Sequence, residues 1–358
     1  MNHAAREVAR RRLRAQLLSA TTFAKAADVV AWLGAVQAQD YSGALWAVGL
    51  RMVDARACDV ERSIEERAIV RSWPMRGTLH FLAASDARWM MELLAPRAAA
   101  AAAGRLRAMG IDERVLSRAR RALVKTLEGG GRVTRPAAYR LLERAGISTQ
   151  GERGLHILWR LAHEGLLCFG PREGKKPTFV LLEEWLPGGR RLRRDEALAE
   201  LARRYFRGHG PATAEDLAWW SGLALSDARR AIAAAGKLVE SETIGGRPYL
   251  SAPSATSPDP TRARGGAHAL PPFDEFLVGY KDRSAALDSA NAARLSAFEV
   301  LGPVIILGGQ LVATWKRRIV GGKVTFSTAP LSRLSEANAR ALERTLARYA
   351  RFFELQGR

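Results

Sequence analysis

The stretch GRVTRPAAYRLLERAGIS (residues 131–148) decides the fold of this chain. Thr134 precedes a run with helical spacing, and Pro136 falls in its first turn, where proline needs no amide hydrogen. Gly146 stands at the exit, where glycine commonly ends a helix. Residues 151–167 then repeat apolar residues at helical spacing. The sequence here therefore predicts two consecutive helices joined by a short turn.

Two segments with the alternation of strands follow these helices, at 166–170 and 177–185, on either side of the basic turn PREGKK (171–176). Helix, turn, helix and hairpin in this order form a winged-helix unit. The same order returns as two helices over 210–236 and a hairpin over 237–252, which has Gly-Gly at its turn.

A more degenerate copy of the unit comes before these two. It consists of helices around 25–37, 44–53 and 57–66 and a hairpin over 69–83. After the last copy, residues 251–268 are rich in Pro, Ser, Ala and Gly, which is typical of a linker or long surface loop. The chain continues with strands within 304–327 and a final helix over roughly 332–354.

These patterns predict an α+β fold that is mainly helical, with three tandem winged helix-turn-helix units and a C-terminal αβ region. We expect five segments: a first winged-helix unit over 1–110, a second over 111–192, a third over 193–252, a linker or long loop over 253–269, and a C-terminal region with a basic hairpin over 270–358. One winged helix usually serves a transcription regulator, whereas three in one chain are uncommon for a simple repressor.

The charge of the chain favours a polyanionic partner. Among 358 residues, 56 are Lys or Arg and 36 are Asp or Glu, so the formal net charge is +20 and the pI is about 11.0. Nucleic acid is the default partner of so basic a protein. The alternative is a high-GC genome, which inflates arginine and alanine together, and the many alanines show that this bias is present.

Targeting and redox features indicate a cytoplasmic, nucleoid-associated protein. No apolar run has the length of a membrane span. The basic N-terminus, residues 1–18, lacks an apolar signal core and fits a first amphipathic helix better than a transit peptide. Cys58 and Cys168 are far apart without a CxxC pattern, and the six histidines show no metal-binding spacing. We therefore expect no disulfide, no metal and no cofactor.

The stretch VQAQDYSGALWAV (residues 36–48) places two glutamines beside an apolar run. Apolar residues before the pair repeat at helical spacing, so the pair follows an amphipathic helix. Gln37 and Gln39 share a face only if the chain leaves the helix near residue 37 and becomes extended. Asp40 suits such an exit and is interpreted as a cap or supporting residue. Taken without the other motifs, the pair favours a structural interpretation, as a helix C-terminal cap and a solvated turn, over a catalytic one.

Four motifs occur in an order that is specific as a set. They are QAQD (37–40), RSWPMRGTLHFL (71–82), RYFRGHGPATAEDLAWWSGL (204–223) and LPPFDEFLVGYKDR (270–283). Together they resemble the AlkZ/YcaQ family of winged-helix DNA glycosylases over nearly the whole chain. The resemblance implies three winged helices in a C-shaped array with a concave DNA-binding face. It also implies excision of alkylated bases and, in some members, unhooking of interstrand crosslinks.

The resemblance implies catalytic residues as well. The AlkZ branch has the signature Gln-x-Gln and the YcaQ branch has Gln-x-Asp, so Gln37-Ala38-Gln39 places this chain in the first branch, and Asp40 is one position late for the second. Cleavage of an N-glycosidic bond builds positive charge on the sugar. An amide is not an anion, but its oxygen can accept a hydrogen bond from water and direct a dipole at that charge. This suffices when the base is already cationic and leaves neutral, as a purine alkylated at N7 or N3 does.

Basic residues on two hairpins are candidates for DNA binding. Arg71 and Arg76 would meet phosphates or the lesion, and the alternative is a basic surface hairpin. The resemblance implies a DNA-probing hairpin near residues 315–326, and the cations there are Lys316, Arg317, Arg318 and, past the Gly321-Gly322 turn, Lys323. The alternative is a solvated strand edge protected by charge.

Other residues of these motifs are interpreted as structural. His80 is expected to be a hydrogen-bonded strand histidine, and Trp219-Trp220 to be core rather than a base-stacking platform. YKDR (280–283) is expected to be a salt-bridged element of the fold, with a direct DNA role as the alternative.

We therefore expect a monomeric, monofunctional DNA glycosylase that hydrolyses the N-glycosidic bond of cationic N7- or N3-alkyl purines in double-stranded DNA. No lysine stands in a nucleophile motif, so lyase chemistry through a Schiff base is not indicated. Unhooking of crosslinks made by DNA-alkylating natural products would make it an antibiotic self-resistance enzyme of base excision repair. The alternative is a non-catalytic winged-helix DNA-binding protein such as a transcription regulator.

Overall fold

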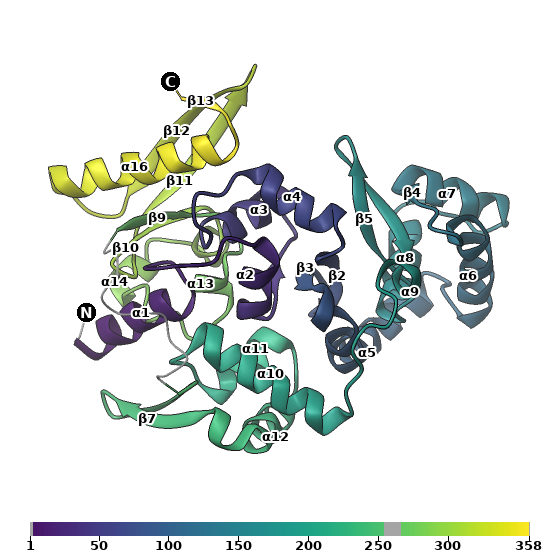
Figure 1. The fold of residues 1–358 in the computed structure, drawn as a ribbon, viewed down its shortest axis with the longest axis horizontal. Coiled ribbons are helices and arrows are strands. Elements are labelled where there is room, and N and C mark those ends of the chain that lie inside the picture. The colour runs from purple at the N-terminus through teal and green to yellow at the C-terminus, as the bar shows by residue number, and fades with distance from the viewer. Residues whose placement is uncertain (1–2, 254–265, 358) are drawn as a thin grey trace. The chain divides into compact units, whose positions relative to one another are not determined.

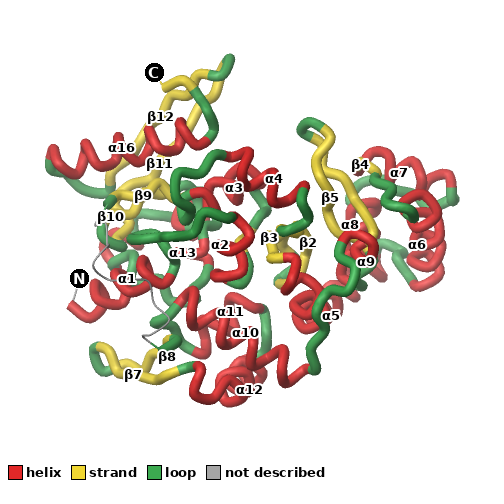
Figure 2. Tube along the Cα trace, in the orientation of Figure 1, coloured by secondary structure: helices red, strands yellow, loops and turns green. Residues whose placement is uncertain are grey.

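A computed structural model describes residues 3–253 and 266–357, which form two compact units (Figure 1). The split unit comprises residues 1–61 and 198–358, and the middle unit comprises residues 62–197. Within the described ranges, no helix is both long enough and apolar enough to cross a bilayer. Figure 2 shows that helices predominate in the fold and that strands gather in sheets and hairpins, so the chain is of mixed α and β structure. Apart from the end of the linker, the division into five segments stays a prediction.

In the middle unit, the first helix predicted within residues 131–148 is α7 (Arg135–Arg144). Thr134 occupies its N-cap position, Pro136 lies at its start, and Gly146 follows its end at φ = 69°, so both boundaries are as predicted. The second predicted helix is α8 (Arg153–His163), and its apolar residues are buried in the core of this unit.

An antiparallel sheet and further helices complete the middle unit. They are β2 (Ile69–Met75), β3 (Thr78–Ala83), α5 (Ala84–Ala108), α6 (Glu113–Leu127), β4 (Val133–Thr134), β5 (Leu167–Glu173), β6 (Lys176–Leu181) and α9 (Leu182–Trp185). Strands β3, β2, β5, β6 and β4 are hydrogen-bonded neighbours in that order. The strand predicted over 177–185 is wrong in its second half, because residues 182–185 close a helical turn that buries Leu182.

The split unit begins with several short elements. They are α1 (His3–Ala15), α2 (Ala26–Leu33), β1 (Val36–Gln37), α3 (Tyr41–Gly49) and α4 (Ala57–Glu65), the last of which continues into the middle unit. The helix predicted over 25–37 is too long, because Gly34 takes φ = 82° and ends α2. The helix predicted over 44–53 begins earlier than expected, because Asp40 occupies the N-cap position of α3, and it also ends earlier, at Gly49.

The third predicted helix pair and its hairpin are present. The elements are α10 (Arg194–His209), α11 (Ala214–Ser221), α12 (Leu225–Ala235), a 3-10 turn (Gly236–Leu238), β7 (Glu240–Ile244) and β8 (Arg247–Ser251). Gly245 and Gly246, at φ = 59° and 80°, join β7 to β8 as predicted. Thr213 caps α11 through a reciprocal pair of hydrogen bonds with Asp216.

The C-terminal part of the split unit contains a second sheet. Its elements are β9 (Ala267–Leu270), α13 (Glu275–Val278), α14 (Ser289–Ala292), α15 (Ala297–Val300), β10 (Val304–Leu307), β11 (Gln310–Val320), β12 (Lys323–Pro330), α16 (Glu336–Phe352) and β13 (Gln356–Gly357). The strand order is β13-β12-β11-β10-β9. The linker predicted over 253–269 ends too late, because residues 267–269 pair with β10 as part of β9. Residues 254–265 lie outside the described residues.

Helix α3 is attached to this C-terminal sheet. Trp46 is fully buried, its Nε1 donates a hydrogen bond to the Ala269 carbonyl at 2.7 Å, and its ring packs edge-on to Tyr349 at 5.2 Å. Because α3 starts at Tyr41, these contacts fix the chain just after the glutamine pair.

Candidate active site

The glutamine pair lies on the short segment between α2 and α3. Gly34 ends α2, Val36–Gln37 forms β1, and Asp40 stands at the N-cap of α3. The chain is therefore extended at Gln37, as a shared face for the two amides requires. Gln37 is buried, with 7% of its surface exposed, whereas Gln39 is exposed. Asp40 holds the cap position without a side-chain capping bond, so its capping role is limited to the backbone.

A buried carboxylate holds the backbone of Gln37. The Gln37 amide N–H donates to Oε1 of Glu275 at 3.0 Å, and Glu275 has no exposed surface. The other oxygen, Oε2, accepts a hydrogen bond from Trp220 Nε1 at 2.8 Å and lies 3.2 Å from Nε2 of His209. Because a carboxylate oxygen accepts, Nε2 is the nitrogen of His209 that would donate in this contact, and among the described residues Nδ1 has no hydrogen-bond partner.

A second layer of buried polar groups surrounds this carboxylate. Gln16 Nε2 donates to the Glu275 carbonyl at 3.0 Å and to the Tyr280 hydroxyl at 3.1 Å, and that hydroxyl donates to the His209 carbonyl at 2.9 Å. The Tyr205 ring stacks on His209 at 4.7 Å. Burial raises the pKa of the Tyr205 and Tyr280 hydroxyls above their ordinary range, so both remain protonated donors at neutral pH.

A buried ion pair completes the network. Arg51 donates to both oxygens of Asp274, at 2.8 and 2.9 Å, and to Oε1 of Gln16 at 2.9 Å. Arg51 and Asp274 have side chains with no exposed surface. A buried pair with its hydrogen bonds satisfied favours one arrangement of the groups around it, because breaking it would leave a charge without water.

The network joins three of the motifs that carry the family resemblance. Gln37 comes from residues 37–40, His209 and Trp220 from 204–223, and Glu275 and Tyr280 from 270–283. Sequence reasoning missed the role of Glu275 and His209. The available signal was an acidic residue inside the apolar run FDEFLV, because a carboxylate in such a position needs hydrogen-bond donors.

The structural interpretations of the other motif residues are largely confirmed. Trp220 is fully buried, whereas Trp219 is 43% exposed and donates to the Val278 carbonyl at 3.1 Å. In YKDR, Asp282 forms an ion pair with Arg247, as expected for a salt-bridged element of the fold. The predicted core position is therefore confirmed for Trp220 and wrong for Trp219. Neighbouring residues of a helix point in different directions, so α11 buries Trp220 and leaves Trp219 partly exposed.

The predicted arginines of the middle unit lie on and beside β2. The Arg71 guanidinium lies 4.9 Å from the Phe169 ring centroid. Arg76, in the β2–β3 turn, donates to Nε2 of His80 at 3.2 Å. His80 is fully buried and its Nδ1 lies 2.9 Å from the Thr78 carbonyl, which confirms a structural histidine. These arginines belong to a different unit from the glutamine pair.

The predicted basic hairpin is formed by β11 and β12. Gly321 and Gly322 make its turn at φ = 56° and 75°, and Ile319 pairs with Val324. Along β11, Lys316 and Arg318 are exposed, while Arg317 alternates to the other face, where its guanidinium lies 5.1 Å from the Tyr349 ring centroid. Lys323 is exposed after the turn. The three consecutive cations therefore divide between two faces.

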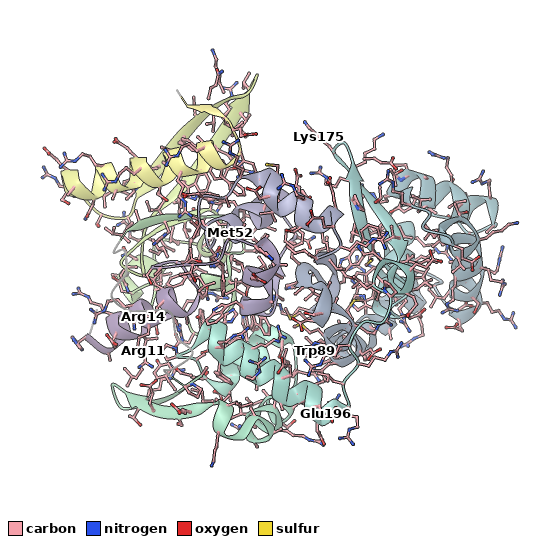
Figure 3. All side chains as sticks on the ribbon, viewed as in Figure 1. Arg11, Arg14, Met52, Trp89, Lys175 and Glu196 are labelled. Carbon is pink, nitrogen blue, oxygen red and sulfur yellow. The ribbon has the colours of Figure 1, made fainter. Side chains whose placement is uncertain are left out.

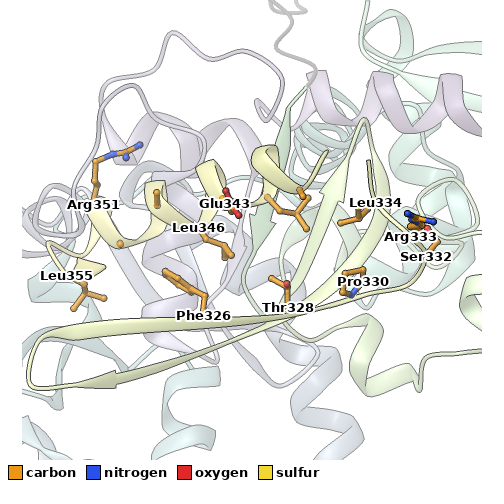
Figure 4. A pocket seen from close by; sticks show the side chains of 14 residues that line it. Phe326, Thr328, Pro330, Ser332, Arg333, Leu334, Glu343, Leu346, Arg351 and Leu355 are labelled. Carbon is orange, nitrogen blue, oxygen red and sulfur yellow. The ribbon is translucent and has the colours of Figure 1, made fainter. Parts of the chain in front are cut away.

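A groove separates the hairpin from α16 (Figure 4). Phe326, Thr328 and Pro330 of β12 face Leu346 of the helix across it. Neither glutamine of the pair lines this groove. Among the described residues, no group of three or more His, Cys, Asp or Glu side chains could hold a metal ion, and both cysteines are free.

Comparison with known proteins places the chain in a family. The model of the family described as DNA glycosylase AlkZ-like matches residues 30–352, a range that includes the glutamine pair, the buried network and the basic hairpin. The chain belongs to the AlkZ-like DNA glycosylase family. It is therefore a DNA glycosylase, and the alternative of a non-catalytic regulator is not supported.

Relatives of this AlkZ-like chain agree in length and fold. An interstrand DNA cross-link repair glycosylase from Streptomyces sahachiroi is 28% identical over an alignment of 326 residues that covers 87% of this chain and 87% of the relative. The solved structure of the Streptomyces sahachiroi DNA glycosylase AlkZ superposes with a TM-score of 0.80 and 26% sequence identity, covering 100% of both chains. The likeness extends over the whole length and is not confined to one helix-turn-helix.

Proposed function

We propose that Gln37 and Gln39 are the catalytic residues of a monofunctional glycosylase that removes cationic N7- or N3-alkyl purines from double-stranded DNA. The observation that carries this proposal is the burial of Gln37 and the anchoring of its backbone to Glu275. A solvated turn would need no such support, whereas a catalytic group gains from being held in one geometry.

The chemistry follows from what two amides can do. One amide oxygen accepts a hydrogen bond from water and orients it toward the anomeric carbon, while the dipoles of the pair stabilise the positive charge that develops on the sugar. No group has to donate a proton to the leaving base, because the cationic alkylated purine departs neutral when it takes the electrons of the C–N bond, and the proton that the attacking water loses passes to solvent. An unmodified purine would have to depart as an anion, which is a poor leaving group, so the same site does not cleave its N-glycosidic bond.

DNA would be bound by the cations outside this site. Lys316, Arg318 and Lys323 are exposed on the β11–β12 hairpin, and the net charge of +20 favours a polyanion throughout. We also propose that the helix pairs followed by hairpins act as three winged helices, with Arg71 and Arg76 on the first wing. In the second such hairpin, Lys175 stands at the tip (Figure 3).

Crosslinked purines are the second substrate class we propose. The relative named as an interstrand DNA cross-link repair glycosylase aligns with 87% of this chain, and the residues around Gln37 lie inside the matching family range. An enzyme that unhooks crosslinks made by a DNA-alkylating natural product would protect its producer. We therefore propose self-resistance as the biological role.

The test is direct. The protein is incubated with a duplex that contains one N7-methylguanine, and hot alkali then reveals abasic sites as strand breaks. We expect breaks at the lesion and none in the unmodified duplex. Tight binding to the lesion duplex without strand breaks above the uncatalysed background would overturn the proposed activity.

A further inference from the structure

We infer that Glu275 is a positioning residue, which holds Gln37 in the geometry that orients water; this inference rests on the proposed function of the two amides. Glu275 is the first residue of the short helix α13, and it lies 238 positions from Gln37 in the chain. Its carboxylate is nonetheless the group that accepts the Gln37 backbone hydrogen.

The carboxylate suits this position because three N–H groups converge on it. Gln37 N meets Oε1 at 3.0 Å, and Oε2 meets Trp220 Nε1 at 2.8 Å and His209 Nε2 at 3.2 Å. The two oxygens of a carboxylate both accept hydrogen bonds, so the group can serve all three donors. A glutamine at position 275 would replace one of these two oxygens by an NH2 group. That group would face either the Gln37 N–H or the Trp220 and His209 N–H groups, and the buried position leaves no water to satisfy the unpaired donors.

The contact involves the backbone N–H of Gln37, not its side-chain amide. Glu275 is fully buried, so it does not reach DNA itself. The Trp220 ring also lies close to Gly34, where an added Cβ would come within 3.3 Å of Cη2. Glu275 thus holds the backbone at Gln37, and Trp220 lies beside the turn where the chain leaves α2.

The test is a double-mutant cycle between Glu275→Gln and Gln37→Ala. Gln37→Ala removes the side chain but keeps the backbone N–H, so the contact with Glu275 persists in that background. We expect E275Q to lower the single-turnover excision rate about 10- to 100-fold, the scale of a catalytic group displaced by about 1 Å. In the Q37A background the same substitution should lower the remaining rate less than about twofold, since the positioned side chain is already absent.

Asp216→Asn is the matched control. Asp216 is also a buried carboxylate of the split unit, and it accepts hydrogen bonds from the Thr213 and Lys281 amides at 3.0 and 2.9 Å. We expect D216N to lower the thermal unfolding midpoint as E275Q does, but to leave the excision rate unchanged. If E275Q does not fold, Trp220→Phe, which removes one donor to Oε2, replaces it in the cycle.

The outcomes separate the inference from the proposed function. Equal rate losses from E275Q in the wild-type and Q37A backgrounds would overturn the positioning role, as would an equal rate loss in D216N. If Q37A and Q39A excise at the wild-type rate, the catalytic assignment of the amides fails, whatever E275Q does.

Discussion

The glutamine segment at residues 34–40 and the β11–β12 hairpin belong to the same unit, but the side chains that we propose as functional in them are held in opposite ways. Gln37 is buried, and its backbone is tied to Glu275 within a network of buried polar groups. Lys316 and Arg318 instead stand exposed on a two-stranded arm that ends in a Gly-Gly turn.

The difference matches the physics of the two tasks. Orienting a water against one carbon requires a geometry fixed to a fraction of an ångström, which only rigid surroundings supply. Attraction to phosphates acts over roughly a Debye length, about 8–10 Å at physiological salt, and tolerates mobile side chains. Removing a group should therefore abolish chemistry in the first region and weaken binding in the second.

The largest effect is expected from the glutamine pair. Gln37→Ala and Gln39→Ala should each lower single-turnover excision of N7-methylguanine by roughly 10- to 1000-fold, the scale of losing one positioned polar group. Affinity for the lesion duplex should change little, because neither amide supplies charge. Gln150→Ala, at an exposed glutamine of the middle unit, is the matched control and should excise at the wild-type rate. Wild-type excision by the double variant Gln37→Ala, Gln39→Ala would contradict the catalytic role that we propose for the pair.

Acid should affect the buried region next. Burial, with Arg348 and Arg51 nearby, lowers the pKa of His268 from 6.5 to about 4. Between pH 4 and pH 6.5, His268 is therefore protonated in the unfolded chain but neutral in the folded chain. Its contribution to the free energy of unfolding is fully present above pH 6.5 and declines as the pH falls toward 4. The free energy of unfolding should fall by up to about 3 kcal/mol over that window from this residue.

The substitution His268→Phe isolates this effect. Urea unfolding at pH 7 and at pH 5 should show a smaller loss of stability in the variant than in the wild type. His3→Asn, at an exposed position of α1, should behave as the wild type does. The same acid sensitivity in His268→Phe and in the wild type would show that other groups control acid unfolding.

A moderate effect is expected at the hairpin. In the double variant Lys316→Ala, Arg318→Ala, log affinity should fall less steeply with log salt. The magnitude of the negative slope should decrease by about 0.9 per lost phosphate contact. We expect crosslink unhooking to fall about tenfold and N7-methylguanine excision to fall less than about threefold, because a crosslinked base cannot swing out and needs the duplex held in place. The measurement is a pair of single-turnover rates on the two substrates. Equal losses would make the arm a general phosphate anchor, and no loss would make it a charged strand edge.

The smallest effect is expected from Arg317→Ala. Its guanidinium faces the Tyr349 ring on the side of the hairpin opposite to Lys316 and Arg318. The substitution should lower the free energy of unfolding by about 0.5–1 kcal/mol, the scale of a partly exposed cation–π contact, and leave the salt slope unchanged. A salt slope that falls as far in Arg317→Ala as in the exposed-face variants would show that both faces of the hairpin meet DNA.

Local chain chemistry made several features predictable. Thr134, Pro136 and Gly146 set the bounds of α7, and Gly-Gly pairs set two hairpin turns, because these residues restrict or permit particular φ values whatever lies around them. The same reasoning misjudged α2, whose apolar pattern runs on past Gly34, while the backbone at that glycine had already left the helix.

The sequence by itself determined helix α7, the Gly-Gly hairpin turns, the excess of positive charge and the glutamine pair as a candidate site. Only the tertiary structure decided that Gln37 is anchored, since Glu275, His209 and Trp220 come from segments far apart in the chain. It likewise decided that Arg317 faces Tyr349 while its neighbours face solvent. The physical reason is that a buried carboxylate is tolerated only where several donors converge, and that convergence depends on how distant elements pack, which no local pattern of residues encodes.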